Sequence, residues 1–274
     1  MSEMLTAILN SSMAMIPWLA GFFVVFAVLE RLMPCNPGQR YLTKNILTDT
    51  AYFFIAPIFT RFISIGYVSI GIITFFHGQS PEAISSYLAH GFGPLSQLPI
   101  WLQAAMVFII SDILLYWTHR WFHRRKMWRF HAIHHSSTPV SWHSTYRFHP
   151  VNIWLSFTLV DTLMLFVGFS PESVSVMAAF NMIYSAMVHA NLNWTFGPFK
   201  YLFASPVFHR WHHTAQEEGM DKNFAPTFPL LDIIFGTFYM PEGRLPESYG
   251  VPGSDIPHGF WRQIVWPFRK PKGR

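Results

Sequence analysis

Five apolar stretches close to the length of a membrane-spanning helix constrain the fold of this chain more than any other feature. A helix needs about 20 mostly apolar residues to cross the hydrocarbon core of a bilayer. Only 12% of the 274 residues are charged, about half the fraction usual in soluble domains, and the mean hydropathy is +0.25. The sequence therefore predicts an all-α integral membrane protein with about four to five transmembrane or hairpin helices, over residues 13–29, 47–76, 100–117, 153–168 and 174–188.

The stretches are expected to meet the membrane in different ways. No Lys or Arg precedes residues 13–29 and no small-residue cleavage site follows, so we interpret them as a retained anchor rather than a signal peptide. Residues 47–76 are too long for one upright span. We expect residues 47–57 to approach along the interface, with Arg61 snorkelling at the near end of the span. The last two stretches are short and predict a hairpin.

Lys and Arg are unevenly distributed between these stretches. Residues 77–99, between the second and third stretches, contain none, whereas basic residues precede the second stretch and follow the third and the fifth. By the positive-inside rule, the N-terminus faces out and the two large polar segments form a helical cap on the cytoplasmic side. The net charge of +5 then suits anionic lipid headgroups, and no nucleic-acid partner is expected.

Histidine is as frequent as Asp and Glu together, and most of it lies in residues 119–149 and 189–213. The segments HRWFH, HAIHH and HRWHH space their histidines by three or four residues, so each can present its imidazoles on one helix face. Neutral imidazole is the commonest metal ligand and suits iron, zinc and copper. These three histidine boxes favour a metal site over solvated or headgroup-binding helix faces. They comprise His119, His123, His131, His134, His135, His209, His212 and His213.

Neighbouring residues exclude several other metal chemistries. Cys35 is the only cysteine, so this chain alone holds neither a cysteine zinc finger nor an iron–sulfur cluster. Arg120 follows His119 at the position where a zincin protease carries its catalytic Glu. No carboxylate lies inside a box, in contrast to the Glu-rich sites of soluble di-iron bundles. The sequence predicts a site built from histidine.

These boxes and their flanks resemble the membrane-bound fatty acid hydroxylase and sterol desaturase superfamily. The resemblance includes SDILLYWTHRWFH, then HHSS and RFHP after the second box, and DKNFAPTFPLLDIIFGT after the last, so it covers residues 110–237. Two departures from the family pattern, Ala225 in place of Gly and Leu231 in place of Trp, weaken any subfamily assignment but not the metal site. The resemblance implies a membrane anchor region over residues 1–99, a catalytic domain over 100–240 and a basic, aromatic cytoplasmic tail over 241–274.

The resemblance also implies a cofactor and a chemistry. It implies two iron ions, cycling between Fe2+ and Fe3+, that use O2 to hydroxylate or desaturate a C–H bond of a fatty acyl or sterol-like membrane lipid in lipid biosynthesis. The family often adds a histidine before the last box, which falls on His189. The sequence has no dinucleotide fingerprint, haem motif or cysteine cluster, so electrons are expected from a separate donor: a cytochrome b5-like protein, a ferredoxin or a reductase. The implied ligands are His119, His123, His131, His134, His135, His189, His209, His212 and His213.

Polar residues near the boxes are candidates to support these ligands. Ligand histidines usually donate their second N–H to a carboxylate or carbonyl, and Asp112 lies two helical turns before His119. Asp161 is a second acid inside an apolar stretch, where charge is costly and suggests function. For Asn193, a weak ligand role and a plain helix-terminal role stay open. The candidate supporting residues are Asp112, His143, His149, Asp161, Asn193, Asp221 and Asn223, and Asp232 matches the same family tail.

Two alternatives stay open at this point. One is a histidine-rich metal-binding or metal-transporting membrane protein without oxygenase activity, although transport would require ligands near the bilayer midplane. The other is a structural zinc site, because imidazole also binds zinc. We expect the bacterial inner membrane rather than the endoplasmic reticulum, although Lys270 and Lys272 also fit an endoplasmic-reticulum retrieval signal.

Overall fold

The computed structural model describes residues 2–40 and 43–269, and within these ranges every regular element is a helix. The basic end of the tail, with Lys270, Lys272 and Arg274, lies outside the described residues. The α-helices are α1 Ser2–Leu32, α2 Ile46–Phe75, α3 Pro81–His90, α4 Gly93–Ser96, α5 Ile100–Phe122, α6 Arg125–His135, α7 Pro150–Ile153, α8 Leu159–Val167, α9 Pro171–His189, α10 Pro206–His212, α11 Leu230–Ile234 and α12 Phe260–Val265. A 3-10 turn, η1, covers Trp142–Tyr146, and a π-helical turn, η2, joins α7 to α8 over Trp154–Thr158.

Four helical segments among the described residues are long and apolar enough to cross a membrane: Met13–Leu32, Ile46–Phe75, Ile100–Phe122 and Pro150–Val167. Many of their large apolar side chains are exposed, as expected for surfaces that face lipid. This confirms an all-α membrane protein at the lower end of the expected four to five spans. The second stretch is a single helix, with no break where we expected the approach along the interface to end.

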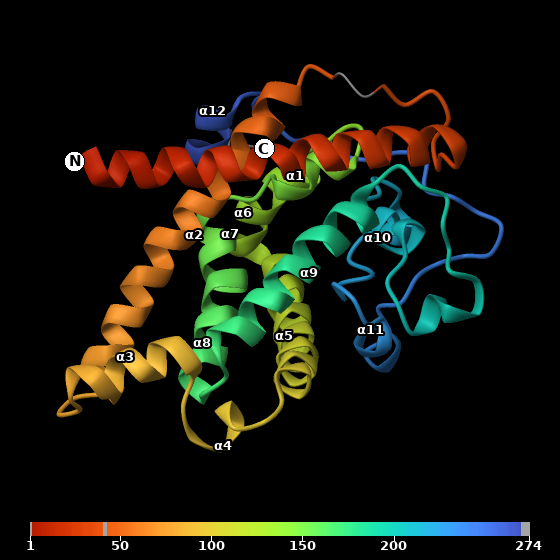
Figure 1. The fold of residues 1–274 in the computed structure, drawn as a ribbon. Helices are drawn as coiled ribbons and strands as arrows, with labels where there is room; N and C mark the ends of the chain where they lie inside the picture. Colours follow the sequence, from red (N-terminus) through yellow and green to blue (C-terminus); the bar gives the residue numbers. More distant parts are fainter. Residues whose placement is uncertain (1, 41–42, 270–274) are drawn as a thin grey trace.

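The fourth and fifth stretches form the predicted hairpin. A left-handed Gly168, with φ 111°, ends α8, and Ser170 accepts the backbone N–H of Ser173 to begin α9. The α9 helix, 19 residues long, is not among the segments that are long and apolar enough to cross a membrane. It runs diagonally up to α10 (Figure 1).

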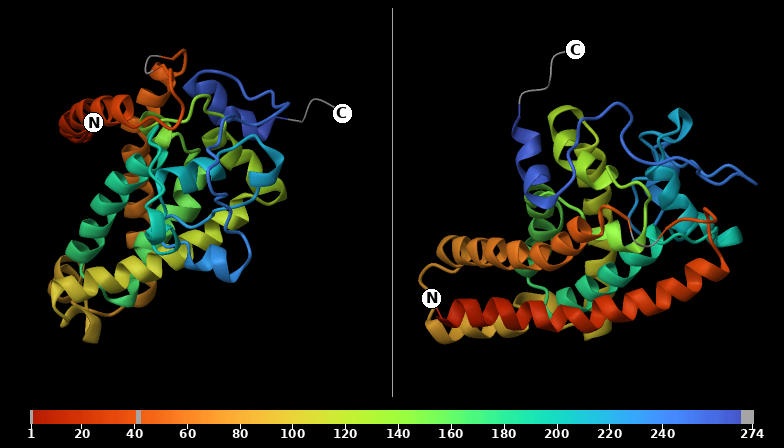
Figure 2. Two further views of the ribbon diagram at one scale, coloured as in Figure 1. Left: turned by 90° about the vertical axis from the view of Figure 1, so that its right-hand side faces the viewer. Right: turned by 90° about the horizontal axis from the view of Figure 1, so that it is seen from above.

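The first helix has an orientation that its composition could not predict. Figure 1 shows α1 lying across the upper ends of α2, α5 and α8 rather than alongside them, and Figure 2 shows the same arrangement from the side and from above. Its contacts explain this position, because Phe22 and Phe26 pack with Trp142, Ala186 and Leu192 near the C-terminal end of α9. The apolar first helix thus covers the end of the bundle where the histidines lie.

Candidate metal centre

Four helix ends bring the histidines together. His119 and His123 lie at the C-terminal end of α5, which continues past its apolar stretch, and the HAIHH box ends α6. His189 is the last residue of α9. The last box forms α10, which begins at Pro206 after Ser205 accepts the backbone N–H of Phe208. All nine histidines implied by the sequence therefore reach one region.

The nine side chains form two groups, in each of which the potential ligand atoms lie within 4.8 Å of one another. Within a box, histidines four residues apart belong to the same group. A histidine three residues after the first histidine of its box belongs to the other group. Each box of three therefore serves both groups, although its spacing suggested a single direction. The first histidine group is His119, His123, His131, His135 and His212, and the second histidine group is His134, His189, His209 and His213.

The two groups lie side by side and their Nε2 atoms converge. In the first group, Nε2 of His119 and Nε2 of His131 are 3.0 Å apart. In the second group, Nε2 of His189 lies 3.1 Å from that of His134 and 3.0 Å from that of His209. The rings of His135 and His213 stack across the boundary with centroids 4.3 Å apart. The arrangement suits two adjacent metal ions.

A single loop after the last box, residues 221–224, orients three of the five histidines of the first group. The Nδ1–H of His119 donates to the carbonyl of Phe224, and that of His212 donates to the carbonyl of Lys222, both at 2.7 Å. His123 Nδ1 lies 3.0 Å from the carboxylate of Asp221. Because each Nδ1 is held from outside, each Nε2 is turned inward, which is how outer partners fix ligand imidazoles.

Buried polar side chains hold this loop in place. Asn223 donates to the carbonyls of Phe208 and Tyr239 and accepts the N–H of Tyr239. The carboxylate of Asp232 accepts the N–H groups of Phe224 and Ala225. The sequence motif after the last box therefore supports the site through its backbone carbonyls as much as through its side chains.

The second histidine group has fewer outer partners. The Nδ1–H of His189 donates to the carbonyl of Ser185 at 2.7 Å. The buried Nδ1 atoms of His134, His209 and His213 have no hydrogen-bond partner among the described residues. The ring of His134 instead stacks on Phe148, with centroids 4.0 Å apart. The two groups thus differ in how firmly their ligands are oriented.

The electrostatics of the site keep the imidazoles neutral. Burial, together with the charge that neighbouring histidines would carry if protonated, lowers the pKa of His135, His209 and His213 well below the ordinary value. Neutral imidazole is the form that binds metal. The buried Nε2 atoms of His123, His135 and His212 have no partner among the described residues. Inward-facing, neutral and unpartnered nitrogens fit a pair of transition-metal ions.

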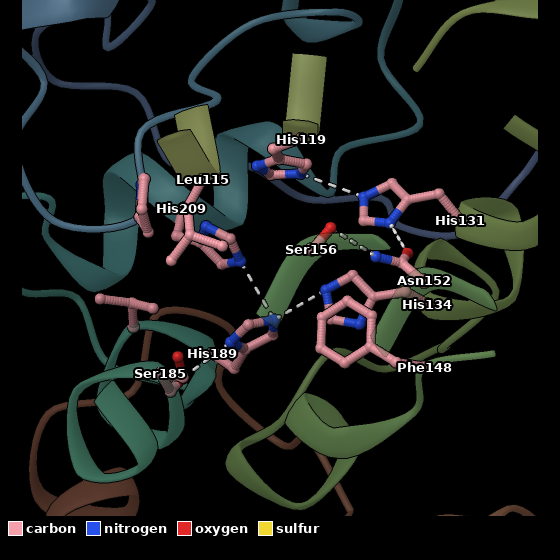
Figure 3. Close-up of a pocket in the computed structure, with 12 residues that line it drawn as sticks. Leu115, His119, His131, His134, Phe148, Asn152, Ser156, Ser185, His189 and His209 are labelled. Atoms are coloured by element: carbon pink, nitrogen blue, oxygen red, sulfur yellow. Dashed lines mark hydrogen bonds between the residues drawn. The ribbon is translucent and has the colours of Figure 1, made fainter. Parts of the chain in front are cut away.

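A small cavity of about 70 Å³ opens on the boundary between the groups. Figure 3 shows His119 and His131 of the first group and His134, His189 and His209 of the second around it. Its remaining walls are mostly apolar, with Leu115, Phe148, Val188 and Pro226, and Asn152 and Ser156 add polar groups. A carbon chain in this cavity would lie against both groups.

The structure places the other predicted site residues at different distances from this centre. Asp221 contacts His123, and Asn223 holds the loop. Asp112 contacts the backbone N–H groups of Thr227 and Phe228 rather than a histidine, since two helical turns carry it about 10 Å away from His119.

The remaining candidates lie outside both groups. His143 contacts Thr50, and His149 contacts the carbonyl of Ile264. Asn193 is exposed, and Asp161 lines a separate cavity.

Sequence reasoning missed two residues that the structure brings to the site. Asn152 accepts the Nδ1–H of His131 at 2.7 Å. In the sequence, this role was indicated by the position of Asn152 as a polar residue at the start of an apolar helix. Arg210, fully buried within the last box, donates to the carbonyl of Val140 and to the hydroxyl of Tyr249. Nothing in its spacing distinguished it from a surface arginine.

Fold and site together define a helical membrane protein with two adjacent histidine groups that could each hold a metal ion. A family profile of fatty acid hydroxylases matches residues 104–237. The chain is 30% identical over 259 residues to ornithine lipid hydroxylase from Rhizobium tropici, which covers 91% of this chain and 74% of the relative. The chain belongs to the fatty acid hydroxylase family and is a lipid oxidoreductase.

More distant relatives match a smaller share of the chain. Alkylglycerol monooxygenase from Homo sapiens is 33% identical over 132 residues, which is 48% of this chain and 29% of the relative. Delta(7)-sterol 5(6)-desaturase from Gibberella zeae is 26% identical over 172 residues, covering 60% and 44%. No solved structure matches. The names of these relatives describe hydroxylation, monooxygenation or desaturation of lipids.

Proposed function

We propose that the two histidine groups each hold one iron ion and that the protein uses O2 to hydroxylate or desaturate a C–H bond of a membrane lipid. The observation that carries this proposal is the convergence of nine imidazoles, from seven buried and two half-buried residues, in two adjacent groups beside a largely apolar cavity. The iron pair supplies, when bound, the activation of O2 that an unreactive C–H bond requires. Histidine is also the ligand type that the family implies.

The chain's own residues contribute binding, orientation and exclusion of water. Leu115, Phe148 and Val188 present apolar surface to a carbon chain and keep bulk water from the cavity. The loop carbonyls of Lys222 and Phe224 hold two imidazoles in one tautomer, with Nε2 facing inward. These residues position the substrate carbon beside both groups.

The substrate and partners follow from the setting of the site. We propose a fatty acyl or sterol-like lipid, which reaches the site from the bilayer, and a separate electron donor of the cytochrome b5, ferredoxin or reductase type. The charge distribution supports a site on the cytoplasmic side, and the similarity to a bacterial relative supports the bacterial inner membrane. The proposed catalytic domain is residues 100–240.

The proposal is tested by metal content and by exchange of single ligands. The purified full-length protein should contain about two iron ions per chain, one for each histidine group. His134→Ala and His212→Ala should each abolish lipid oxidation and leave a protein that elutes as a single folded species. Zinc in place of iron, or unfolding of both variants, would favour a structural site instead.

A further inference from the structure

A second and larger cavity, of about 430 Å³, adjoins the site and is lined in part by residues of the candidate membrane-spanning helices α2, α5 and α8. Leu115, Phe148 and Ser185 line both cavities, so the larger one begins where the smaller one ends. The rest of its surface is largely apolar, with side chains such as Phe53, Val160 and Met182. A lipid chain that extends from the histidines into the bilayer would occupy this space.

A row of polar residues on α9 connects the two cavities. Asn181, Ser185 and His189 are spaced by four residues and therefore lie on one face of the helix. All three line a cavity, Asn181 the larger one, His189 the smaller one and Ser185 both. Eight residues of helix place Asn181 roughly 12 Å from His189 along the axis.

The polar end of the larger cavity also holds an acid. Asp161, on α8, lines it together with Asn181 and the exposed Arg61 of α2. Neither the Asp161 carboxylate nor the Asn181 amide has a hydrogen-bond partner among the described residues. Both residues are half-buried, and a polar group that faces a largely apolar cavity has few other partners, so leaving it unpaired there costs free energy. A ligand that supplies the missing partner is therefore favoured at this place.

We propose that Asp161 and Asn181 bind a hydroxyl group of the lipid substrate, with Asn181 about 12 Å along α9 from His189. A hydroxyl both donates and accepts, so it can donate to the Asp161 carboxylate and accept from the Asn181 amide. A substrate that already bears a hydroxyl group therefore fits better than a purely hydrocarbon one. The inference rests on the proposed lipid oxidation and specifies its substrate class.

The experiment compares two photoreactive probes on the full-length, iron-loaded protein in lipid nanodiscs. One probe is a long-chain fatty alcohol with a diazirine, and the other is the matching diazirine alkane. Half-saturating concentrations are measured by mass spectrometry of the labelled chain. The wild type should bind the alcohol at least about tenfold more tightly than the alkane, as a hydrogen bond to a charged group allows.

Variants assign the preference to the polar end of the cavity. Asp161→Leu and Asn181→Leu should each reduce the preference for the alcohol and leave binding of the alkane within about twofold. Met182→Leu changes the same cavity without a polar group and should keep the preference. Where Asp161→Leu does not fold, Asn181→Leu provides the comparison.

The outcomes separate this inference from the proposed function. Equal binding of both probes by the wild type, or a preference that survives Asp161→Leu, would show that water or lipid tails fill this end of the cavity and would overturn the inference. Lipid oxidation would be unaffected by that result. A protein that prefers the alcohol but oxidises no lipid would contradict the proposed function and leave the binding site standing.

Discussion

Nδ1 of His131 and Oδ1 of Asn152 lie 2.7 Å apart, both fully enclosed. The Asn152 amide also donates to the hydroxyl of Ser156, which fixes the direction in which its oxygen points. The α7 helix thereby orients a histidine of α6. This contact resembles those that Lys222 and Phe224 make, but it comes from α7 rather than from the loop after the last box.

Replacing Asn152 should weaken metal binding without unfolding the protein. Asn152→Leu keeps the size of the side chain but removes the acceptor of His131, and loss of such a partner costs about 10- to 100-fold in metal affinity. Asn193→Leu, at an exposed position outside both groups, is the matched control. Iron affinity is measured by competition with a chelator of known strength. Equal affinity of the two variants would show that the Asn152 contact is not important.

Removal of metal should proceed in two phases. The first histidine group has outer partners for four of its five members, whereas in the second group only His189 has one among the described residues. We expect a chelator to release iron from the second group first. Atomic absorption of the protein at successive times measures this. In Asn152→Leu, iron should leave the first group faster, so that the rates of the two phases become more similar. A single phase in the wild type would contradict the difference between the two groups.

A buried ion pair holds the segment after the second box. Nε of Arg147 donates to the Asp49 carboxylate at 2.6 Å, which joins this segment to α2. Arg147→Met leaves Asp49 buried without its partner and should destabilise the fold by about 3–5 kcal/mol. The double variant Asp49→Leu, Arg147→Met removes both charges and should recover most of that loss. Thermal unfolding in detergent tests this, and a double variant less stable than the single one would contradict it.

Acid should destabilise the protein partly through His143. Burial, with the nearby Arg147 charge, lowers the pKa of His143 from its ordinary 6.5 to about 4. The folded state therefore favours the neutral ring, so this stability is present above pH 6.5 and is lost as the pH falls towards 4. The loss from this one group is at most about 3 kcal/mol.

His143→Gln removes that titration but can still donate to Thr50, which contacts Nε2 of His143 at 3.1 Å. Melting curves of both proteins near neutral pH and near pH 4 give the comparison. The wild type should lose more stability between the two conditions than the variant. Parallel losses would mean that His143 does not titrate in this window.

The sequence indicated which histidines gather, but not how they divide into two groups. Spacing by three and four residues places each box on one side of a helix, and the resemblance to a known family added His189. Adjacent residues such as His134 and His135 diverge by about 100°, so which metal each faces depends on how α6 meets α5 and α10.

The roles of the supporting residues depend on contacts between distant segments. Asp112 holds backbone 115 residues away, and no local pattern reveals that contact. The helices that are long and apolar enough to cross a membrane were predictable from hydropathy. The crosswise direction of α1 was not, because it is set by the packing of Phe22 and Phe26 against α9 and the η1 turn.

The central claim is that the protein oxidises a membrane lipid with iron held by the two histidine groups. Lipid mass spectrometry tests this claim most directly. Cells that produce the wild type should contain a lipid with one added oxygen or two fewer hydrogens. Under labelled O2, an added oxygen should carry the label. Cells that produce His212→Ala at equal level should lack this lipid. Identical lipid profiles for the two proteins would contradict the account.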